Sequence, residues 1–472
     1  MITSAPSGSF LPGAGTEAPE TTEAEVRAAA AEVRAAAAEA AAAQPGWAAR
    51  APGERAAVLR RALALLAAPP PDLTDLFVRE SGAVRPKAEM ELGAAMGELA
   101  FAAGLAGQAA APAALDSTVE GRTARAERVP LGVVGVITPW NMPLMLALRS
   151  VAPALALGNA VLLKPDPHTP VVGGRFVAWL FRRAGLPDGL LHVLPGGAAT
   201  GTAVVEAPEV AMVSFTGSTE AGRSVARTAG GLLKKVSLEL GGNNAFVVLA
   251  DADVDAAASA GAFGSFVHSG QLCIAVGRHL VHRSVAERYT AALAQKAEAL
   301  TAGDPADPAT RIGPLIDERQ LAKVRAIVAD TVAAGARLVC GGTTEGRVHR
   351  PTVLDRVRPG MRAFDEEIFG PVAPVTVFED DDEAVALADA TGHGLAAAVY
   401  AGAPEAARAV AARLRAGMVH VGDQTVVSEP QLPFGGVGSS GNGGRFGGPA
   451  AVEAFTQWRL TTESTPPRRY PF

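Results

Sequence analysis

The stretch Val133-Val134-Gly135-Val136-Ile137 opens a series of short, apolar, β-branched runs that decides the fold class. Further runs of this kind are Ala160-Val161-Leu162-Leu163, Leu191-His192-Val193-Leu194 and Met212-Val213-Ser214-Phe215. Helical segments lie between several of these runs, as expected when parallel strands are joined by crossover helices. The pattern therefore predicts an α/β protein that contains a parallel sheet.

The same alternation restarts after Glu239. Ala245-Phe246-Val247-Val248-Leu249 is a predicted strand, and a long helical segment separates it from Gly277-Arg278-His279-Leu280-Val281. A chain of 472 residues is also too long for a single ordinary core. We therefore expect two doubly wound α/β domains with a cleft between them.

The segments outside these series have different compositions. Residues 1–20 are rich in Pro, Gly, Ser and Thr and are predicted to form a loose tail. An Ala-rich helix is expected from Thr22 to Ala43, and a second helix from Pro52 to Leu66. Ser117–Pro130 and Ala450–Thr462 have extended or hairpin character.

Composition argues against several functional classes. The hydrophobic fraction of 49% and the charged fraction of 19% are typical of a globular protein. A net charge of −6 provides no basic surface for nucleic acid or anionic lipid. The two cysteines, Cys273 and Cys340, do not form a disulfide framework and fit a reducing compartment. We expect a cytoplasmic protein with no nucleic-acid partner.

Two further features bear on location. The N-terminal residues lack the basic and apolar regions of a signal peptide. Leu131–Leu148 carries no charge over a length that could nearly span a bilayer. Because this stretch contains Gly132, Pro139 and Pro143, it is better explained as a buried strand followed by a turn. No membrane association is expected.

Two segments contain residues suited to covalent catalysis. Cys273 ends the run Phe266-Val267-His268-Ser269-Gly270-Gln271-Leu272-Cys273, and Glu239 lies in Leu238-Glu239-Leu240-Gly241-Gly242-Asn243. A cysteine provides a soft nucleophile, and a carboxylate can serve as a general base. Alone, a cysteine is usually a small buried hydrophobe, and a glutamate often forms a helix cap or a salt bridge. Gly241 and Gly242 would permit a close backbone approach in a site loop.

Several other motifs accompany these two in the chain. They are Thr138-Pro139-Trp140-Asn141-Met142-Pro143, Leu163-Lys164-Pro165, Phe215-Thr216-Gly217-Ser218-Thr219-Glu220-Ala221-Gly222-Arg223, Glu366-Glu367-Ile368-Phe369-Gly370-Pro371 and Pro433-Phe434-Gly435-Gly436. In this order, from about Gly46 to Thr462, the motifs resemble those of the NAD(P)-dependent aldehyde dehydrogenases. The resemblance implies oxidation of a small-molecule aldehyde to the carboxylic acid, with NAD(P)+ and water as co-reactants.

The resemblance also assigns catalytic roles. Cys273 would form a thiohemiacetal and then a thioester with the substrate, and Glu239 would activate the water that hydrolyses the thioester. The side-chain amide of Asn141, together with the Cys273 backbone N–H, would stabilise the oxyanion. Without its companions, Asn141 would be interpreted as a turn residue between two prolines.

The cofactor is expected to be NAD or NADP. The run from Phe215 to Arg223 follows a strand and opens a helix, and the N–H groups at a helix N-terminus can bind pyrophosphate. Its spacing alone is a weak signal, because it is not the G-x-G-x-x-G pattern. The residues that the resemblance places at the cofactor are Ile137, Trp140, Lys164, Gly217, Ser218, Thr219, Gly222, Leu240, Glu367 and Phe369; no metal site is expected.

The resemblance further predicts how the chain is divided. A Rossmann-like cofactor domain would comprise residues 21–116 and 131–240, and a catalytic domain residues 241–440. Residues 117–130 and 450–472 would form a small β arm for oligomerisation. The expected assembly is a homodimer or a homotetramer.

Three positions depart from the family pattern. Pro167 occupies the place of a glutamate that binds the adenosine ribose and repels a 2′-phosphate, which makes NADP admissible; the nearby Asp166 argues for NAD. Arg445 stands where many members have a glutamate that assists the base, and Gly422 replaces a common asparagine.

Other local runs resemble the subgroup of benzaldehyde, vanillin and salicylaldehyde dehydrogenases. These runs are Lys164-Pro165-Asp166-Pro167, Arg149-Ser150-Val151-Ala152-Pro153, Asp423-Gln424-Thr425-Val426 and Gly441-Asn442-Gly443. An aromatic aldehyde is therefore expected, and the candidate substrate residues are Met142, Met145, Arg149, Ile274 and Phe434. For Arg149 two interpretations remain open, namely a contact with a ring substituent and a structural salt bridge.

Rival functions remain to be tested. The same cysteine and glutamate could cleave activated esters without a cofactor, as a thiol esterase. An aliphatic aldehyde or a semialdehyde could replace the aromatic substrate. A catalytically silent scaffold is a third class, although such a protein has no reason to retain Cys273, Glu239 and Asn141 together.

Overall fold

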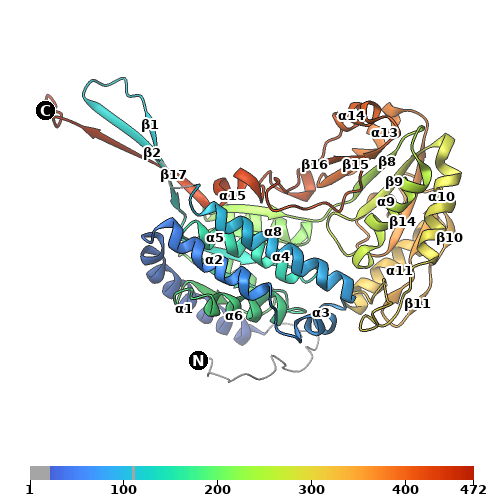
Figure 1. The fold of residues 1–472 in the computed structure, drawn as a ribbon, viewed down its shortest axis with the longest axis horizontal. Coiled ribbons are helices and arrows are strands. Elements are labelled where there is room, and N and C mark those ends of the chain that lie inside the picture. The colour runs from blue at the N-terminus through green and yellow to red at the C-terminus, as the bar shows by residue number, and fades with distance from the viewer. Residues whose placement is uncertain (1–21, 109–111) are drawn as a thin grey trace.

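The computed structural model describes residues 22–108 and 112–472. It consists of two α/β units side by side and a narrow arm that projects from the first unit (Figure 1). The tail predicted for residues 1–20 lies outside the described residues. Within the described part of the chain, no helix is both long enough and apolar enough to cross a membrane.

The sheet of the first unit is entirely parallel and has the strand order β5-β4-β3-β6-β7. Its strands are β3 (Val133–Ile137), β4 (Ala160–Lys164), β5 (Leu191–Val193), β6 (Val210–Thr216) and β7 (Lys235–Glu239). The chain builds outward from β3 on one side and then returns to add β6 on the other side. This reversal creates a topological switch point at the carboxyl ends of β3 and β6, where open α/β sheets bind their ligands.

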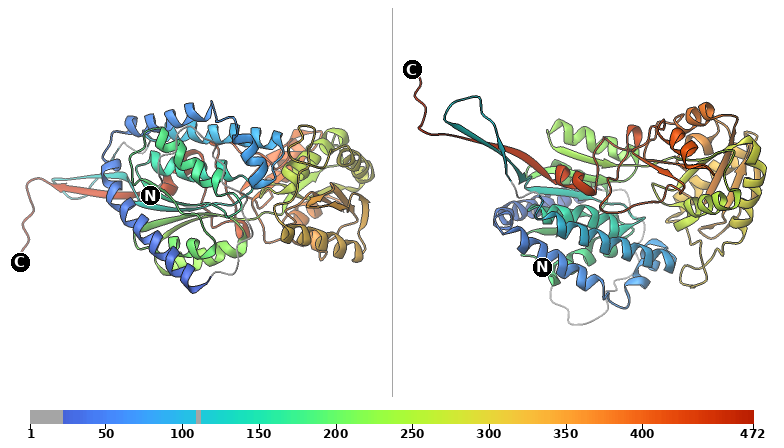
Figure 2. Two further views of the ribbon diagram at one scale, coloured as in Figure 1. Left: turned by 90° about the horizontal axis from the view of Figure 1, so that it is seen from below. Right: turned by 45° about the horizontal axis from the view of Figure 1, so that its top comes forward.

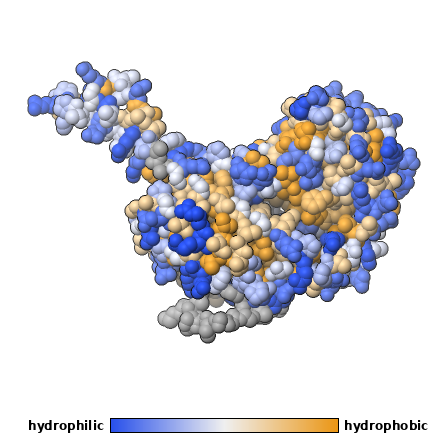
Figure 3. Space-filling model, viewed as in Figure 1, coloured by the Kyte–Doolittle hydropathy of each residue, from blue (hydrophilic) through white to orange (hydrophobic). Residues whose placement is uncertain are grey.

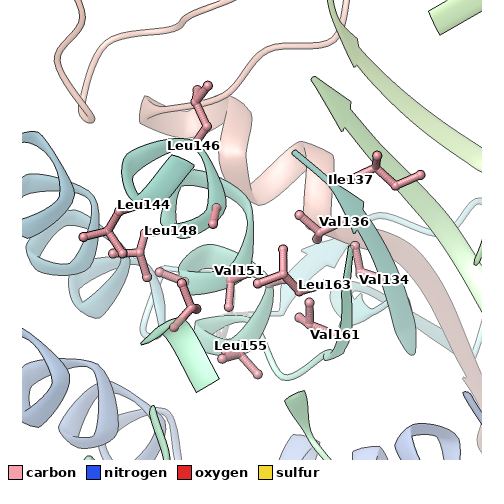
Figure 4. Close-up of a cluster of buried hydrophobic side chains, with 14 of the residues drawn as sticks. Val134, Val136, Ile137, Leu144, Leu146, Leu148, Val151, Leu155, Val161 and Leu163 are labelled. Carbon is pink, nitrogen blue, oxygen red and sulfur yellow. The ribbon is translucent and has the colours of Figure 1, made fainter. Parts of the chain in front are cut away.

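Helices cover both faces of this sheet. They are α1 (Glu23–Ala48), α2 (Pro52–Leu66), α3 (Leu73–Ser81), α4 (Arg85–Leu105), α5 (Pro143–Ala156), α6 (Phe176–Arg183), α7 (Ala198–Glu206) and α8 (Thr219–Gly231). All residues of α5 are buried. Its apolar side chains lie between α4 and the sheet, close to the side chains of β3 and β4 (Figure 4).

The predicted helix from Pro52 to Leu66 is confirmed. The predicted end of the first helix at Ala43 is wrong, because α1 continues through Pro45 to Ala48. Its last turn buries Trp47, whose indole N–H donates to the Leu155 carbonyl at 2.8 Å. Tertiary packing therefore extends the helix past a residue that usually ends one.

The sheet of the second unit has the order β10-β13-β14-β9-β8-β15-β16, and only β10 is antiparallel to its neighbour. Its strands are β8 (Asn244–Val248), β9 (Val276–His282), β10 (Arg337–Cys340), β13 (Thr352–Asp355), β14 (Val372–Phe378), β15 (Ala396–Tyr400) and β16 (Met418–Val421). The helices are α9 (Val254–Phe266), α10 (Arg283–Glu298), α11 (Glu318–Ala333), α12 (Arg362–Asp365), α13 (Asp381–Ala388) and α14 (Pro404–Ala411). A small hairpin, β11 (Thr344–Glu345) and β12 (Val348–His349), lies beside them. The prediction of a second α/β layer is confirmed.

The arm is a three-stranded antiparallel sheet of β1 (Ala113–Leu115), β2 (Arg122–Pro130) and β17 (Thr456–Ser464). Figure 2 shows that it extends well beyond the body in two further views. The predicted extended character of Ala450–Thr462 is wrong in its first half, where Gly448–Phe455 forms α15. This helix buries Ala451, Ala454 and Phe455 against the first unit.

The segment between β16 and α15 returns to the first unit. Phe434 and Phe446 are buried in the same core as β3 and α5. Their backbones pair with each other through two hydrogen bonds of 2.8 Å. Phe434 and Phe446 therefore attach this returning segment to the first unit.

Gly135 provides a test of the packing on the central strand. A Cβ built at Gly135 would lie 2.6 Å from Cγ1 of Val204 on α7. We expect Gly135→Ala to destabilise the protein by about 1–3 kcal/mol, because the overpacked helix must shift. Calorimetric melting temperature is the measurement.

Gly201→Ala is the matched control. Gly201 lies on α7 itself, and its Cβ would have no neighbour closer than 3.9 Å. This variant should melt at or slightly above the wild-type temperature. If Gly135→Ala melted no lower than Gly201→Ala, the assigned packing of α7 on β3 would be wrong.

Candidate active site

The predicted site residues gather where loops of the two units meet. Asn141 follows β3, Glu239 is the last residue of β7, and Cys273 lies in the turn before β9. The surface of the molecule is hollowed between the two units (Figure 3). The parallel strands of the first sheet bring Asn141 and Glu239 to one edge, because their carboxyl ends share it. Cys273 reaches the same place from the amino end of β9 in the second unit.

The start of α5 is fixed by a buried carboxylate from α4. Glu91 accepts hydrogen bonds from the backbone N–H groups of Leu144 and Met145, at 2.8 and 3.2 Å. Lys87 pairs with the same carboxylate at 2.6 Å, and both side chains are fully buried. These contacts satisfy orphan N–H groups of the helix and thereby hold the loop that contains Asn141.

Asn141 links the two units. Its Nδ2 donates to the Gln271 carbonyl at 2.9 Å, two residues before Cys273. Its Oδ1 is buried and has no hydrogen-bond partner among the described residues. An amide nitrogen carries two protons, so one N–H remains for another acceptor near Cys273.

The Cys273 turn is held by an asparagine that the sequence analysis did not identify. Nδ2 of Asn244 donates to the carbonyls of Cys273 and Ala275, at 2.9 and 2.7 Å. Its Oδ1 accepts from the Ala396 N–H at 2.9 Å. A Cβ on Gly242 would lie 2.4 Å from the Cys273 carbonyl oxygen, so the predicted close approach of this glycine is confirmed.

The backbone before Cys273 is strained. His268, Ser269 and Gly270 all have left-handed conformations, with φ of 51°, 55° and 69°. For residues other than glycine this conformation costs about 1–2 kcal/mol each. Gln271 stabilises the turn, since its Oε1 accepts from the Ile316 N–H at 3.0 Å. Strain of this kind is concentrated at functional sites.

Glu239 is a buried carboxylate without a hydrogen-bond partner. Its exposed fraction is 4%, and neither carboxylate oxygen accepts a hydrogen bond from a described residue. Burial raises the pKa of Glu239 well above its ordinary value. The positive charges of Arg149 and Arg445 oppose this shift, as does the nearby Gly436 backbone N–H, which does not reach hydrogen-bond geometry. A carboxyl group with a raised pKa is better matched to proton transfer near neutral pH.

Cys273 is only partly accessible. Burial raises the pKa of its thiol to about 12, the Arg149 charge opposes the shift, and Glu367 and Glu239 add to it. At neutral pH the thiol is therefore protonated, and it needs a base before it can attack. Cys340 is buried elsewhere, and its sulfur faces the Ala294 carbonyl at 3.9 Å.

The predicted pyrophosphate loop has the expected form. Strand β6 leads into α8, and Ser218 is the N-cap, whose hydroxyl accepts from the Ala221 N–H at 3.3 Å. The Gly217 N–H donates to the Glu239 carbonyl at 3.0 Å, and the Thr219 hydroxyl donates to the Ser439 carbonyl at 3.0 Å. The loop is thereby attached to the same strand end as Glu239.

Leu240 and Gly222 meet behind this loop. A Cβ on Gly222 would lie 2.3 Å from a methyl carbon of Leu240, so only glycine permits this contact. Ile137 is buried at the end of β3. These three residues shape the wall on which α8 rests.

Lys164 ends β4 and is almost completely buried. Burial lowers the pKa of its ammonium, although the Asp166 charge opposes the shift. The structure shows no hydrogen bond from this ammonium within the described residues. Asp166 is instead bonded to His168, at 2.8 Å between Oδ1 and Nδ1, and His168 lies 3.6 Å from Asp317 at the start of α11.

Glu367 and Phe369 lie across the cleft from this wall. Oε1 of Glu367 accepts from the Gly242 N–H at 2.9 Å, and burial raises the pKa of this carboxyl to about 7. A Cβ on Gly241 would lie 2.2 Å from Oε2 of Glu367. Phe369 has a left-handed backbone and an edge-on ring contact with Trp140, at 5.6 Å between centroids.

The five candidate substrate residues are all buried, namely Met142, Met145, Arg149, Ile274 and Phe434. The guanidinium of Arg149 lies 4.3 Å from the Phe434 ring centroid. It donates to Glu98 at 3.0 Å and to the Ser428 hydroxyl at 2.5 Å. A structural salt bridge, one of the two interpretations of Arg149, is therefore present.

Sequence reasoning missed Asn244, Glu98 and Gly435. A Cβ on Gly435 would lie 2.5 Å from Oε1 of Glu239, so this glycine admits the carboxylate. Gly435 was visible within the run Pro433-Phe434-Gly435-Gly436. The other two are ordinary polar residues in a strand and a helix, and no local signal distinguishes them.

Comparison with known proteins agrees with this geometry. The model of the aldehyde dehydrogenase family matches residues 17–461. The chain is 50% identical over 419 residues to the benzaldehyde dehydrogenase [NAD(+)] of Pseudomonas putida, covering 89% of this chain and 86% of that protein. It is 49% identical over 420 residues to a vanillin dehydrogenase of Amycolatopsis sp., with the same coverage.

A solved structure of a salicylaldehyde dehydrogenase from Pseudomonas putida G7, complexed with salicylaldehyde, superposes with a TM-score of 0.91. The two sequences are 32% identical, and the match covers 94% of this chain and 92% of that one. The resemblance drawn from the motifs is thus confirmed by similarity over most of the chain. The protein belongs to the aldehyde dehydrogenase family.

Proposed function

We propose that this enzyme oxidises an aromatic aldehyde to the carboxylic acid through Cys273, Glu239 and Asn141, with NAD+ or NADP+ as hydride acceptor. The observation that carries the proposal is the buried Glu239 carboxylate, which has no partner in the described chain and lies close enough to the Cys273 thiol for its charge to raise the pKa of that thiol. Buried groups left unsatisfied require an explanation, and a reacting water molecule provides one.

The first step is attack on the aldehyde. Because the Cys273 thiol is protonated at rest, its proton must leave before the attack. Water can accept this proton slowly, whereas Glu239, whose pKa is raised, accepts it faster and then releases it to solvent. The sulfur then bonds to the carbonyl carbon. The resulting oxyanion accepts hydrogen bonds from the free N–H of the Asn141 amide and from the Cys273 backbone N–H, contacts typically worth about 10²–10³ in rate each.

The residues around the switch point fit a dinucleotide. The Ser218 N-cap begins a helix whose first N–H groups suit a pyrophosphate. The Lys164 ammonium is free to bind ribose or phosphate, and Glu367 faces the cleft beside Gly241. A nicotinamide dinucleotide held by these residues would supply the hydride acceptor for the Cys273 adduct.

The thioester left on Cys273 must then be hydrolysed. Glu239 removes a proton from water as the water oxygen bonds to the acyl carbon. The carbon–sulfur bond breaks, its electron pair returns to sulfur, and the carboxylic acid leaves. Glu239 is buried, with Gly435 against its carboxylate, and this burial keeps its pKa raised.

The names of the relatives support the aromatic substrate. Benzaldehyde, vanillin and salicylaldehyde are all aromatic aldehydes, and the candidate tunnel here contains Met142, Met145, Ile274 and Phe434. The benzaldehyde dehydrogenase of Pseudomonas putida is named for NAD(+). We therefore expect NAD to be used, and NADP to be accepted as well.

Glu239→Gln tests the base. The amide cannot accept the proton of water, so we expect a pre-steady-state burst of NAD(P)H followed by a stall as the thioester accumulates. Cys273→Ala is the control: it should show no burst and should bind the cofactor as wild type does. Full steady-state turnover in Glu239→Gln would reject the assignment.

Lys164→Ala tests how the cofactor is recognised. A charged hydrogen bond to phosphate contributes about 1.5–3 kcal/mol, more than one to a hydroxyl. The dissociation constant of NADP should therefore rise more than that of NAD, as measured by protein fluorescence. Asp166→Asn is the matched variant and should strengthen NADP binding. Equal losses for both cofactors in Lys164→Ala would show that Lys164 does not contact the phosphate.

Substrate preference tests the aromatic assignment. An apolar tunnel gains about 25 cal/mol per Å² of ring surface removed from water, so benzaldehyde should have a much higher kcat/KM than acetaldehyde. Phe434→Ala should reduce this ratio. If acetaldehyde matched benzaldehyde in the wild type, the aromatic assignment would be wrong and the enzyme would be an aliphatic aldehyde dehydrogenase. Ester cleavage without any NAD(P)H formation would favour the hydrolase instead.

Arg149 can be tested separately. Because its guanidinium is committed to Glu98 and Ser428, Arg149→Ala should leave Glu98 buried and unpaired, at a cost of about 3–5 kcal/mol. We expect a lower melting temperature and similar losses for all aldehydes, with a milder loss of stability in Ser428→Ala. A loss confined to hydroxylated or carboxylated benzaldehydes would instead assign Arg149 to a ring substituent.

A further inference from the structure

Arg445 lies in a loop that is fixed at both ends. Phe434 and Phe446 pair through two backbone hydrogen bonds of 2.8 Å, and both rings are buried in the core of the first unit. Arg445 directly precedes Phe446 and is half-buried. The position of its backbone is therefore set by the core.

The side chain of Arg445 closes this loop over Glu239. Nη1 donates to the carbonyls of Gly436 and Gly444, at 3.0 and 2.8 Å. A Cβ on Gly435 would lie 2.5 Å from Oε1 of Glu239 and 2.8 Å from Cδ of Arg445. Both side chains thus lie against the same face of one glycine, whose φ of 154° suits a residue without a side chain.

The charged groups around Glu239 differ in how they are paired. Arg149 approaches from α5, but Glu98 already pairs with it at 3.0 Å. The structure shows no carboxylate within salt-bridge distance of Arg445 in the described chain. Cys273 faces Glu239 from the second unit, with Glu367 beyond it. Arg445 is therefore the cation near Glu239 that no other carboxylate neutralises.

We propose that Arg445 is a positioning residue for Glu239, which holds the Gly435–Gly436 turn against the carboxylate and stabilises its ionised form. The inference rests on the proposed function, in which Glu239 takes a proton from the hydrolytic water. Only an ionised Glu239 can accept that proton while water attacks the thioester and the carbon–sulfur bond breaks. Arg445 thus acts on hydrolysis through Glu239 and does not touch the substrate.

Removal of the Arg445 charge should change how thioester hydrolysis depends on pH. Burial raises the pKa of Glu239, and Arg445 opposes that shift. Without the guanidinium the pKa of Glu239 rises further, so less of the carboxylate is ionised at neutral pH. Thioester hydrolysis should slow at neutral pH and recover at alkaline pH. Removal of a nearby opposite charge typically moves such a pKa by about one unit or more.

The experiment compares Arg445→Met with Arg445→Lys by rapid mixing of enzyme, benzaldehyde and NAD+ across a pH series. In Arg445→Met we expect an NADH burst followed by a slow linear phase at neutral pH. When the rate of this linear phase is plotted against pH, its acidic side should move to higher pH by about one unit. Arg445→Lys keeps the charge and should retain most of the wild-type profile. Arg413→Met is the control, because Arg413 pairs with exposed Asp382 at 2.6 Å and is not one of the charges that shift the pKa of Glu239.

The outcomes separate the possible explanations. The inference is supported if the acidic side of the pH–rate profile shifts in Arg445→Met and returns in Arg445→Lys. The shift should also be absent from the double variant Glu239→Gln, Arg445→Met. An unshifted profile in Arg445→Met, even with a lower melting temperature, overturns it and makes Arg445 a structural clamp alone. Full turnover in Glu239→Gln by itself would overturn the proposed role of Glu239 and, with it, this inference.

Discussion

Burial of the Glu239 carboxylate without a hydrogen-bond partner is the constraint on which the site depends. Taking a charged carboxylate out of water is costly, and the group responds with a raised pKa. The surrounding structure controls how far this shift goes. The Gly435 turn packs against the carboxylate, and the cations Arg149 and Arg445 moderate the shift of its pKa. The balance leaves a buried carboxylate whose pKa lies above its ordinary value.

The rigidity of the first unit makes this balance possible. Helix α5 is buried along its whole length and carries Arg149 in an otherwise apolar environment. The buried ion pair of Arg149 with Glu98 fixes α5 against α4. The Glu91 carboxylate, paired with Lys87 within α4, adds hydrogen bonds from the first N–H groups of α5. Breaking such a pair leaves an uncompensated charge, so the helix has little freedom to move. The Asn141 loop precedes this helix and is held with it. The hydrogen bond from Asn141 to the Gln271 carbonyl connects this loop to the Cys273 turn.

Much of the fold could be predicted from local pattern. The strands from Val133 and from Ala245 are buried on both faces, and they therefore appear as continuous apolar runs. The same pattern could not predict α15. This short helix is stabilised by burial of Phe455 in the core of the first unit, a contact between segments far apart in the sequence. The late end of α1 has the same cause, since Trp47 is fixed by a distant carbonyl.

The site was predictable where a residue's chemistry is distinctive. Cys273, Glu239 and Asn141 were identified from their motifs, and the structure places their segments together. Asn244 and Glu98 act through long-range hydrogen bonds, which depend on the packing of strands and helices far apart in sequence. The left-handed turn at His268 and Ser269 could not be predicted from the sequence, because only a few per cent of residues other than glycine adopt that conformation.

The central claim is that Cys273 carries the substrate as a thioester, and mass spectrometry tests this most directly. Glu239→Gln would be mixed with benzaldehyde and NAD+, quenched in acid and digested. The account predicts a benzoyl group on the peptide that contains Cys273, with the peptide of buried Cys340 unmodified as an internal control. An unmodified Cys273 peptide after NADH has formed, or a benzoyl group at another residue, would contradict it.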